Sequence, residues 1–166
     1  MKLDFYSRLP GASGERERKL VEFLVGEVRY GVDIMLVREI VNPRELIPIP
    51  AAPAHVAGMA DHRAKAVPVI DLRRRLGLEP VDAPRAKWVI VDAGGMDAAI
   101  LVDQVVGVTA VSADLRRERH PLMSGLEARW VKDVFGEGDG LVFELELDEV
   151  AGGVEVDGDA PAKEEL

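Results

Sequence analysis

Short apolar runs separated by turn-forming residues divide this chain, and their spacing limits the folds it can adopt. Leu20–Val25 and Val28–Ile34 flank Gly26-Glu27, a tight hairpin turn. Trp88–Asp92 and Asp97–Val102 flank a second turn with two adjacent glycines, which supply the positive φ angles that hairpins require. Strands at intervals of roughly 8–12 residues predict a mainly β protein made of small barrels or a sandwich.

A faint internal repeat runs through the middle of the chain. Three pairs of segments align in the same order: Val67–Leu72 with Gly140–Leu145, Val56–Met59 with Val131–Val134, and Gly31–Ile34 with Leu101–Gln104. The repeat predicts two similar β-rich halves, and chance similarity is the alternative. We expect the joint near residues 77–87, where two prolines and few apolar residues indicate a surface connection.

The segment Pro53–Leu78 carries the most informative pattern. Pro53 favours the start of a single helical turn that Gly58 closes. The apolar strand after it contains Pro68, which predicts a strand edge or a bulge. Arg63 lies in the polar bend between them, where a fixed guanidinium is suited to bidentate recognition of carboxylates or carbonyls. The alternative is a salt bridge that only ties down the bend.

Two further elements follow from the pattern near the C-terminus. Leu141–Leu147 alternates and predicts a strand with Glu144 and Glu146 on its polar face. Ser124–Glu127 matches a capping box, and the apolar residues after it recur at helical spacing. They predict a short helix with one face formed by Leu126, Trp130 and Val134.

Composition and charge exclude several classes of protein. The net charge of −9 opposes nonspecific attraction to nucleic acid or anionic lipid. The absence of cysteine excludes disulfides and thiolate chemistry, and it suits a reducing cytoplasm. No apolar run approaches the roughly 18 residues that span a bilayer, and the first residues do not form a secretion signal. We therefore expect a cytoplasmic protein that neither binds nucleic acid nor inserts directly into membranes.

The two ends of the chain differ in charge from each other. Residues 1–19 hold five basic and three acidic residues, whereas residues 151–166 hold five acidic residues and Lys163. Both ends are poor in apolar periodicity. We expect a flexible N-terminal arm over residues 1–19, a folded domain over residues 20–150, and an acidic disordered tail over residues 151–166.

The ionisable residues do not assemble into a recognisable active site. His55, His62 and His120 lack the three or four convergent ligands of a zinc site. The glycine-rich segment Gly136–Gly140 carries two acids and leads into a strand, which predicts a tight turn rather than a phosphate loop. We expect no metal, no cofactor and no enzymatic activity.

Other charged residues have structural explanations. Asp33, Asp71 and Asp103 each end a strand, where hydrogen bonds that stabilise turns are favoured over acid–base catalysis. The run Arg73–Arg75 predicts a solvated helical turn, because Leu72 and Leu76 bracket it at helical spacing. An acidic partner, or the acidic tail of this chain, is the alternative for these arginines.

The segment Pro53–Leu78 resembles the CheW family, the receptor–kinase coupling proteins of bacterial chemotaxis. The family pattern is Pro-x-x-(Ile/Val)-x-Gly-(Val/Ile)-x-Asn-x-Arg-Gly followed by Pro-(Val/Ile)-(Ile/Val)-Asp-Leu-Arg. Phe23–Ile40 is similar to the family's opening strand pair, and Ala99–Val106 is similar to its later Gly-Ile-x-Val-Asp-x-Val segment. The resemblance covers about Leu20–Val150.

The resemblance implies a fold of two five-stranded β-barrels packed on a shared core. It also implies a stand-alone, non-catalytic adaptor with two partners: the regulatory domain of a CheA-type histidine kinase and the cytoplasmic tip of a chemoreceptor. The protein-binding residues carried over from the family are Val37, Glu39, Gly58, Asp61 and Arg63. Two of these residues also have purely structural explanations. Val37 could belong to the core, and Gly58 could be required by the backbone conformation.

The chain departs from the family pattern in the Arg63 bend. Asp61-His62-Arg63-Ala64 replaces Asn-x-Arg-Gly, so a negative charge is added and Ala64 opposes the positive φ that glycine allows. These departures leave room for a CheW-like scaffold of a motility or other signalling system that binds a kinase or other partner without a chemoreceptor. A small hydrolytic or metal-dependent enzyme that uses His55, His62 and the strand-end aspartates is a more remote alternative.

Overall fold

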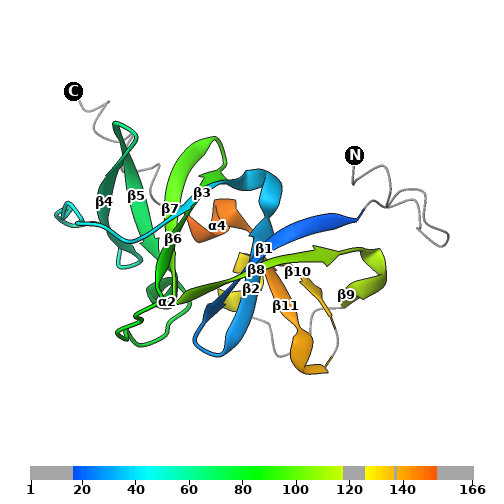
Figure 1. Cartoon of the computed structure of the whole chain (residues 1–166). Coiled ribbons are helices and arrows are strands. Elements are labelled where there is room, and N and C mark those ends of the chain that lie inside the picture. Colours follow the sequence, from blue (N-terminus) through cyan, green and yellow to red (C-terminus); the bar gives the residue numbers. More distant parts are fainter. Residues whose placement is uncertain (1–16, 118–125, 137, 153–166) are drawn as a thin grey trace.

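The protein folds into two curved antiparallel-rich sheets that pack side by side (Figure 1). The computed structural model describes residues 17–117, 126–136 and 138–152. Sheet A has the strand order β8 (Gln104–Val111), β1 (Arg18–Val25), β2 (Val28–Asp33), β11 (Val142–Leu145), β10 (Val131–Phe135), β9 (Arg116–Arg117). Sheet B has the order β3 (Val37–Val41), β6 (Lys87–Ala93), β7 (Met96–Val102), β5 (Lys65–Asp71), β4 (Val56–His62).

Short helices connect the strands. They are η1 (Ile34–Leu36), α2 (Leu72–Arg75), η2 (Ala113–Leu115), α3 (Leu126–Trp130), η4 (Gly138–Gly140) and α4 (Leu147–Val150). None of the helices in the described part of the chain is long and apolar enough to cross a membrane.

The apolar core has three clusters of buried residues. The cluster that both sheets share explains why two small sheets are stable together. One apolar cluster lies within sheet B around Trp88, and another lies within sheet A around Phe135. The largest cluster takes residues from both sheets, including Phe23 of β1 and Ile100 of β7, each fully buried. The expected mainly β fold of two barrel-like subdomains on a shared core is confirmed. Sheet A carries a sixth strand, β9, of only two residues.

The two hairpins expected from the sequence are confirmed. β1 and β2 join at Gly26-Glu27, and β6 and β7 join at Gly94-Gly95. Both glycines of the second turn, and Gly26 of the first, have positive φ.

The two sheets have the same construction. In each, one hairpin is flanked by an antiparallel edge strand on one side and by a parallel strand on the other. β4 and β5 pair with a bulge between Val56 and Gly58, and β10 and β11 pair with a bulge between Val131 and Asp133. These two pairs therefore occupy equivalent places, as the alignment of the segments around them suggested.

The alignment of the following strand was displaced by two residues. Gly58 pairs with Val69, and the equivalent Asp133 pairs with Glu144. Val69 therefore corresponds to Glu144 rather than to Val142. A shift of two residues keeps each side chain on the same face of a strand, so the apolar pattern alone did not reveal the error.

The halves of the repeat do not form separate lobes. The first half supplies β1 and β2 to sheet A and β3, β4 and β5 to sheet B, and the second half supplies the complementary strands. The segment over residues 77–86 joins α2, which follows β5, to β6, and both strands belong to sheet B. The expected joint between two lobes is therefore a connection within one of them.

Two local expectations, for Gly58 and for Pro68, were wrong because tertiary pairing took precedence. Gly58 does not close a helical turn but lies inside β4, after a single turn in which the Val56 amide donates to the Pro53 carbonyl. Pro68 lies in β5, an inner strand, although β5 pairs with β7 only from Val69 onward. Pro68 therefore precedes the part of β5 that is paired on both sides.

The C-terminal elements are shorter than expected. α3 ends at Trp130, and Val134 belongs to β10. β11 ends at Leu145, and Leu147 begins α4. Glu144 is not on a solvent face but is 1% exposed.

Most of the expected arm and tail, residues 1–16 and 153–166, lies outside the described residues. The boundaries of both segments are corrected by the residues that are described. Arg18 and Lys19 belong to β1, and Ala151 is buried against the shared core.

Candidate functional site

Three side chains, from β3, from β4 and from the turn after β4, meet at the outer end of sheet B. Glu39 comes from β3, His62 from the end of β4, and Arg63 from the turn that follows. The Arg63 Nε donates to Glu39 Oε1 at 2.9 Å, and His62 Nε2 lies 3.1 Å from the same oxygen. β3 and β4 are the two edge strands of sheet B, so these contacts connect its edges.

The turn that carries Arg63 has an unusual backbone. Arg63 and Ala64 have φ angles of 52° and 64°, the signs found at both central residues of a type I′ hairpin turn. A left-handed conformation costs an L-residue with a side chain about 1–2 kcal/mol. Ala64 therefore adopts a positive φ although its Cβ was expected to oppose one. The turn is strained at the position where the CheW pattern has glycine.

Arg63 is bound at one nitrogen and exposed elsewhere. Its side chain is 74% exposed, whereas that of Glu39 is 33% exposed. The Arg63 hydrogen bond lowers the pKa of the Glu39 carboxyl below its ordinary value, and Glu39 in turn raises the pKa of Arg63. Among the described residues, only Glu39 forms a hydrogen bond and ion pair with the Arg63 guanidinium, through Nε. Its terminal NH₂ groups therefore remain able to bind a carboxylate or carbonyl of another molecule.

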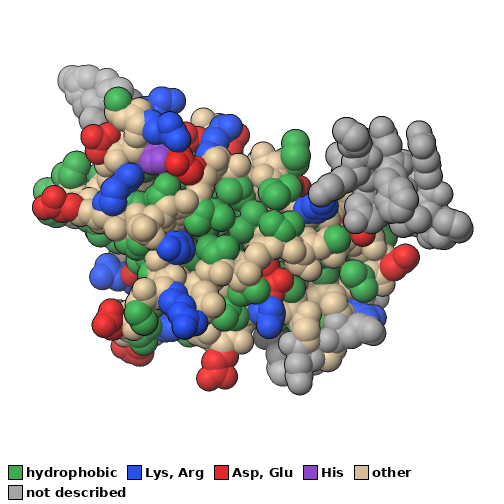
Figure 2. All heavy atoms as spheres, in the orientation of Figure 1, with side chains coloured by type: hydrophobic (Ala, Val, Ile, Leu, Met, Phe, Trp, Pro, Cys, Tyr) green, Lys and Arg blue, Asp and Glu red, His purple; other side chains and the backbone are tan. Residues whose placement is uncertain are grey.

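An open hollow lies beside this contact and is lined mainly by charged side chains. Besides Glu39, His62 and Arg63, it includes Arg38, Lys65 and Asp97. Arg38 is already paired with Asp92 and Asp97, at 3.2 and 3.1 Å. Figure 2 shows acidic and basic side chains mixed at this end of sheet B.

An apolar surface lies where the two sheets meet. Met35 of η1 is 83% exposed, and Val106 and Val108 of β8 are 45% and 57% exposed. Ile40 of β3 is 40% exposed. Hydrophobic side chains gather at this place in Figure 2, over β3 and β8 as labelled in Figure 1. Exposed apolar area next to a charged rim is typical of protein interaction sites.

The other candidate residues play different parts. Val37 is half-buried on β3 and packs against the shared core. Gly58 has φ of 154°, and a Cβ there would lie 2.9 Å from the Ile47 carbonyl oxygen. The close approach of the Ile47 backbone therefore explains why glycine is required at position 58, as the structural alternative proposed. Asp61 is exposed on β4, and its carbonyl accepts a hydrogen bond from Arg44.

Two residues of this cluster were not expected as binding residues. His62 was considered as a metal ligand or as a residue of a hydrolytic enzyme, and Arg44 was not considered. Arg44 Nη2 lies 3.3 Å from His62 Nδ1, and its guanidinium stacks over Trp88. The position of His62 directly before Arg63 was a usable signal, whereas the contact with Arg44 arises only from the tertiary fold.

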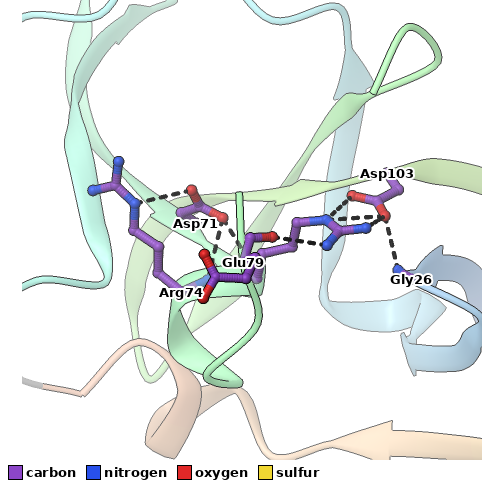
Figure 3. A network of polar contacts seen from close by, with 6 residues as sticks. Gly26, Asp71, Arg74, Glu79 and Asp103 are labelled. Atoms are coloured by element: carbon purple, nitrogen blue, oxygen red, sulfur yellow. Dashed lines mark hydrogen bonds and ion pairs between the residues drawn. The ribbon is translucent and has the colours of Figure 1, made fainter. Parts of the chain in front are cut away.

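The strand-end aspartates stabilise turns, as expected. The Asp33 carboxylate accepts from the Met35 amide, and that of Asp71 accepts from the amide of Arg73. Asp103 accepts from the amide of Gly26 at 2.8 Å and from the Arg73 guanidinium at 2.7 Å (Figure 3). Asp103 thereby joins the β1–β2 turn of sheet A to α2, the helix that follows β5 of sheet B.

The arginine run is used within the molecule. Arg73 binds Asp103, Arg74 binds Asp71, and Arg75 donates to the Glu149 carbonyl at 2.8 Å. Within residues 17–117, 126–136 and 138–152, no three His, Asp or Glu side chains are grouped so that they could hold a metal ion.

Comparison with known proteins gives a consistent assignment. The model of the CheW-like domain matches residues 19–154. A chemotaxis protein CheW of Treponema pallidum is 31% identical, over 86% of each chain. Protein FrzA of Myxococcus xanthus is 30% identical over 63% of this chain and 66% of its own length. The crystal structure of the scaffolding protein TtCheW from Thermoanaerobacter tengcongensis superposes with a TM-score of 0.74 at 27% identity, over 80% of this chain and 91% of that one.

The fold and the site define a β-barrel interaction module with a charged and an apolar surface. The chain belongs to the CheW-like domain family.

Proposed function

We propose that this protein is a non-catalytic adaptor that couples chemoreceptor signalling tips to a CheA-type histidine kinase. The observation that carries the proposal is Arg63, an exposed arginine fixed by one nitrogen at the place of the family's motif arginine. The relatives named as chemotaxis and scaffolding proteins support the same role. Adaptor function requires two binding surfaces and no chemical step. Weak contacts are sufficient if an array keeps the partners at high local concentration.

The receptor-facing residues in this proposal are Val37, Glu39, Gly58, Asp61 and Arg63. Glu39 and Arg63 provide a paired charge, and Arg63 retains donors for a partner. Val37 lies on the same strand as Glu39, next to the apolar surface of β3 and β8. The contribution of Gly58 is indirect, because it allows the Ile47 segment to pass close to β4.

The same proposal implies a cytoplasmic protein that reaches the membrane only through its receptors. It requires no cofactor, no metal and no catalytic group. The regulatory domain of the kinase would occupy a surface other than the one around Arg63, so the two partners would bind together.

The test is a binding experiment with purified protein, a cognate receptor signalling fragment and a CheA-type kinase. Arg63→Ala should weaken receptor binding by about 2–5 kcal/mol if the partner buries the guanidinium, and it should leave kinase binding unchanged. Arg74→Ala is the matched control, because Arg74 is also an exposed arginine, at 49%, whose Nε is paired with one carboxylate, but it lies on α2. Capture of neither partner by the unaltered protein would refute the proposal.

A second candidate is a CheW-like scaffold of another motility or signalling system that binds a kinase or other partner without a chemoreceptor. It is favoured by the strained Arg63-Ala64 turn and by the added charge of Asp61, and the similarity to FrzA supports it weakly. Capture of the kinase together with failure to bind any receptor fragment would select this alternative.

A further inference from the structure

The buried side chain of His62 lies between two charged residues, Glu39 and Arg44. Glu39 also binds the exposed Arg63. The His62 side chain is 9% exposed, and its two ring nitrogens contact different charged residues. Nε2 lies 3.1 Å from Glu39 Oε1, and Nδ1 lies 3.3 Å from Arg44 Nη2. Glu39 Oε1 also accepts from Arg63 Nε at 2.9 Å. One carboxylate oxygen is therefore shared by His62 and Arg63.

The chemistry of the partners fixes the protonation of the ring. A guanidinium has only donors and keeps its proton in proteins, so His62 Nδ1 must accept from Arg44. Nε2 then carries the hydrogen and donates it to Glu39. This pairing corresponds to a neutral ring, with hydrogen bonds that run from Arg44 to His62 and from His62 to Glu39.

Protonation of His62 would disturb both ends of this chain. A hydrogen on Nδ1 would point at Arg44, a donor that cannot accept it. At the other end, Nε2 would become a charged donor to Glu39 Oε1, and charge-assisted hydrogen bonds are the stronger ones. The charged Nε2 of His62 would then compete with Arg63 for Glu39 Oε1.

The hollow beside His62 holds charges of both signs. Lys65 of β5 and Arg38 of β3 also line the hollow, and the acidic groups there besides Glu39 are Asp97 and, through Arg38, Asp92. Asp61 precedes His62 on β4 and is exposed. One added positive charge would make the hollow more attractive to an acidic partner.

We propose that His62 is a positioning residue that makes the binding of an acidic partner segment at Arg63 strengthen as the pH falls. The neutral ring leaves Arg63 paired with Glu39, and the charged ring takes over Glu39 and releases Arg63. This inference rests on the proposed function, in which Arg63 faces a partner.

The first test needs no partner. In the full chain, ¹⁵N NMR should show a hydrogen on Nε2 and none on Nδ1 of His62 at neutral pH. The Arg63 Nε–H resonance should shift together with the His62 signals between about pH 5.5 and about pH 8, which brackets the range in which imidazoles titrate. His62→Gln should abolish that shift. An Arg63 resonance that stays unmoved while His62 titrates would overturn the inference.

The second test uses a cognate receptor signalling fragment as the probe. Binding to the unaltered protein should be roughly two- to fivefold tighter near pH 6 than near pH 8, as expected for one charge pair close to the surface. His62→Gln keeps a neutral donor and acceptor in place of the ring, so it should bind at neutral pH but lose this pH dependence.

His55→Gln is the matched control. His55 is 8% exposed and also lies between an arginine, Arg75, and an oxygen, the Gly152 carbonyl, but it precedes β4, whereas His62 ends this strand. It should keep the pH dependence of the unaltered protein. Full pH dependence in His62→Gln would overturn the inference. If no variant binds the fragment at any pH, the proposed function fails, and the NMR experiment alone decides the role of His62.

Discussion

Backbone conformation at single residues shapes the candidate site. Arg63 and Ala64 both have positive φ, and Gly58 combines a positive φ with a close approach of the Ile47 carbonyl. Only Gly58 is a residue suited to such a conformation. The hairpin that presents Arg63 is therefore held in place by its strands rather than by the preferences of its own turn residues.

Ala64→Gly should stabilise the protein by about 1 kcal/mol, because glycine adopts a left-handed conformation without the Cβ penalty. The free energy of unfolding from urea titration measures the effect. Ala66→Gly is the control, since Ala66 lies in β5 without positive φ, and glycine inside a strand is expected to destabilise. Equal effects of the two substitutions would show that Ala64 is not strained.

At the scale of elements, an ion pair between the partly exposed Arg18 and the buried Glu144 joins β1 to β11. Arg18 donates to both carboxylate oxygens of Glu144, at 2.7 and 3.0 Å, and also to Asp33. The hydrogen bond to Glu144 raises the pKa of Arg18 above its ordinary value. The parallel pairing of β11 with β2 extends over only three residues. The ion pair of Arg18 with Glu144 therefore supplements a short contact between strands.

Arg18→Ala should cost about 3 kcal/mol of unfolding free energy, because it leaves the Glu144 carboxylate buried without its charged partner. Replacing both residues, as in the double variant Arg18→Met/Glu144→Leu, should recover most of the loss. Arg38→Ala should cost under about 1 kcal/mol, since its ion pairs are exposed. A loss in the double variant as large as in Arg18→Ala would contradict this account.

Asp103 makes the junction between the sheets sensitive to acid. Burial acts to raise the pKa of Asp103, but the hydrogen bonds from Arg73 and the Gly26 amide outweigh it, and the pKa lies below its ordinary value. A carboxyl with a depressed folded-state pKa contributes stability that is present above its unfolded pKa, about 4, and is lost as the pH falls through the folded value.

Asp103→Asn should therefore cost about 1–2 kcal/mol at neutral pH, where the charged hydrogen bonds are lost, and less at acidic pH. Urea titrations between about pH 3 and about pH 7 measure the difference. Asp82→Asn, an exposed aspartate in the connection before β6, should show no such convergence. A constant difference between the unaltered protein and Asp103→Asn would contradict the assignment.

At the scale of the whole molecule, the halves of the repeat exchange strands between the sheets. Neither sheet can be completed by one half of the chain. Asp103 joins the sheets at the β1–β2 turn, and Arg75 of α2 joins them again by donating to Glu149 and Gly152 after β11. The two barrels should therefore unfold as one unit.

Chains cut within residues 77–86 test this expectation. Residues 1–80 and residues 81–166 should each be unfolded alone, because β2 and β5 would lack their parallel partners β11 and β7. Mixed together, they should recover the β-type circular dichroism of the intact chain. A half that folds by itself would show that the sheets are independent.

The amino-acid sequence by itself determined the fold class and both hairpins, because alternating apolar residues and glycine turns act over a few residues. It also indicated the repeat, the capping roles of Asp33, Asp71 and Asp103, and the place of Arg63. Only the tertiary structure decided that Gly58 lies in a strand, that Glu144 is buried, and that Glu39 contacts both Arg63 and His62 while Arg44 contacts the other ring nitrogen of His62. These features depend on the pairing of segments far apart in the chain, and local patterns carry no information about which distant strand a residue will meet.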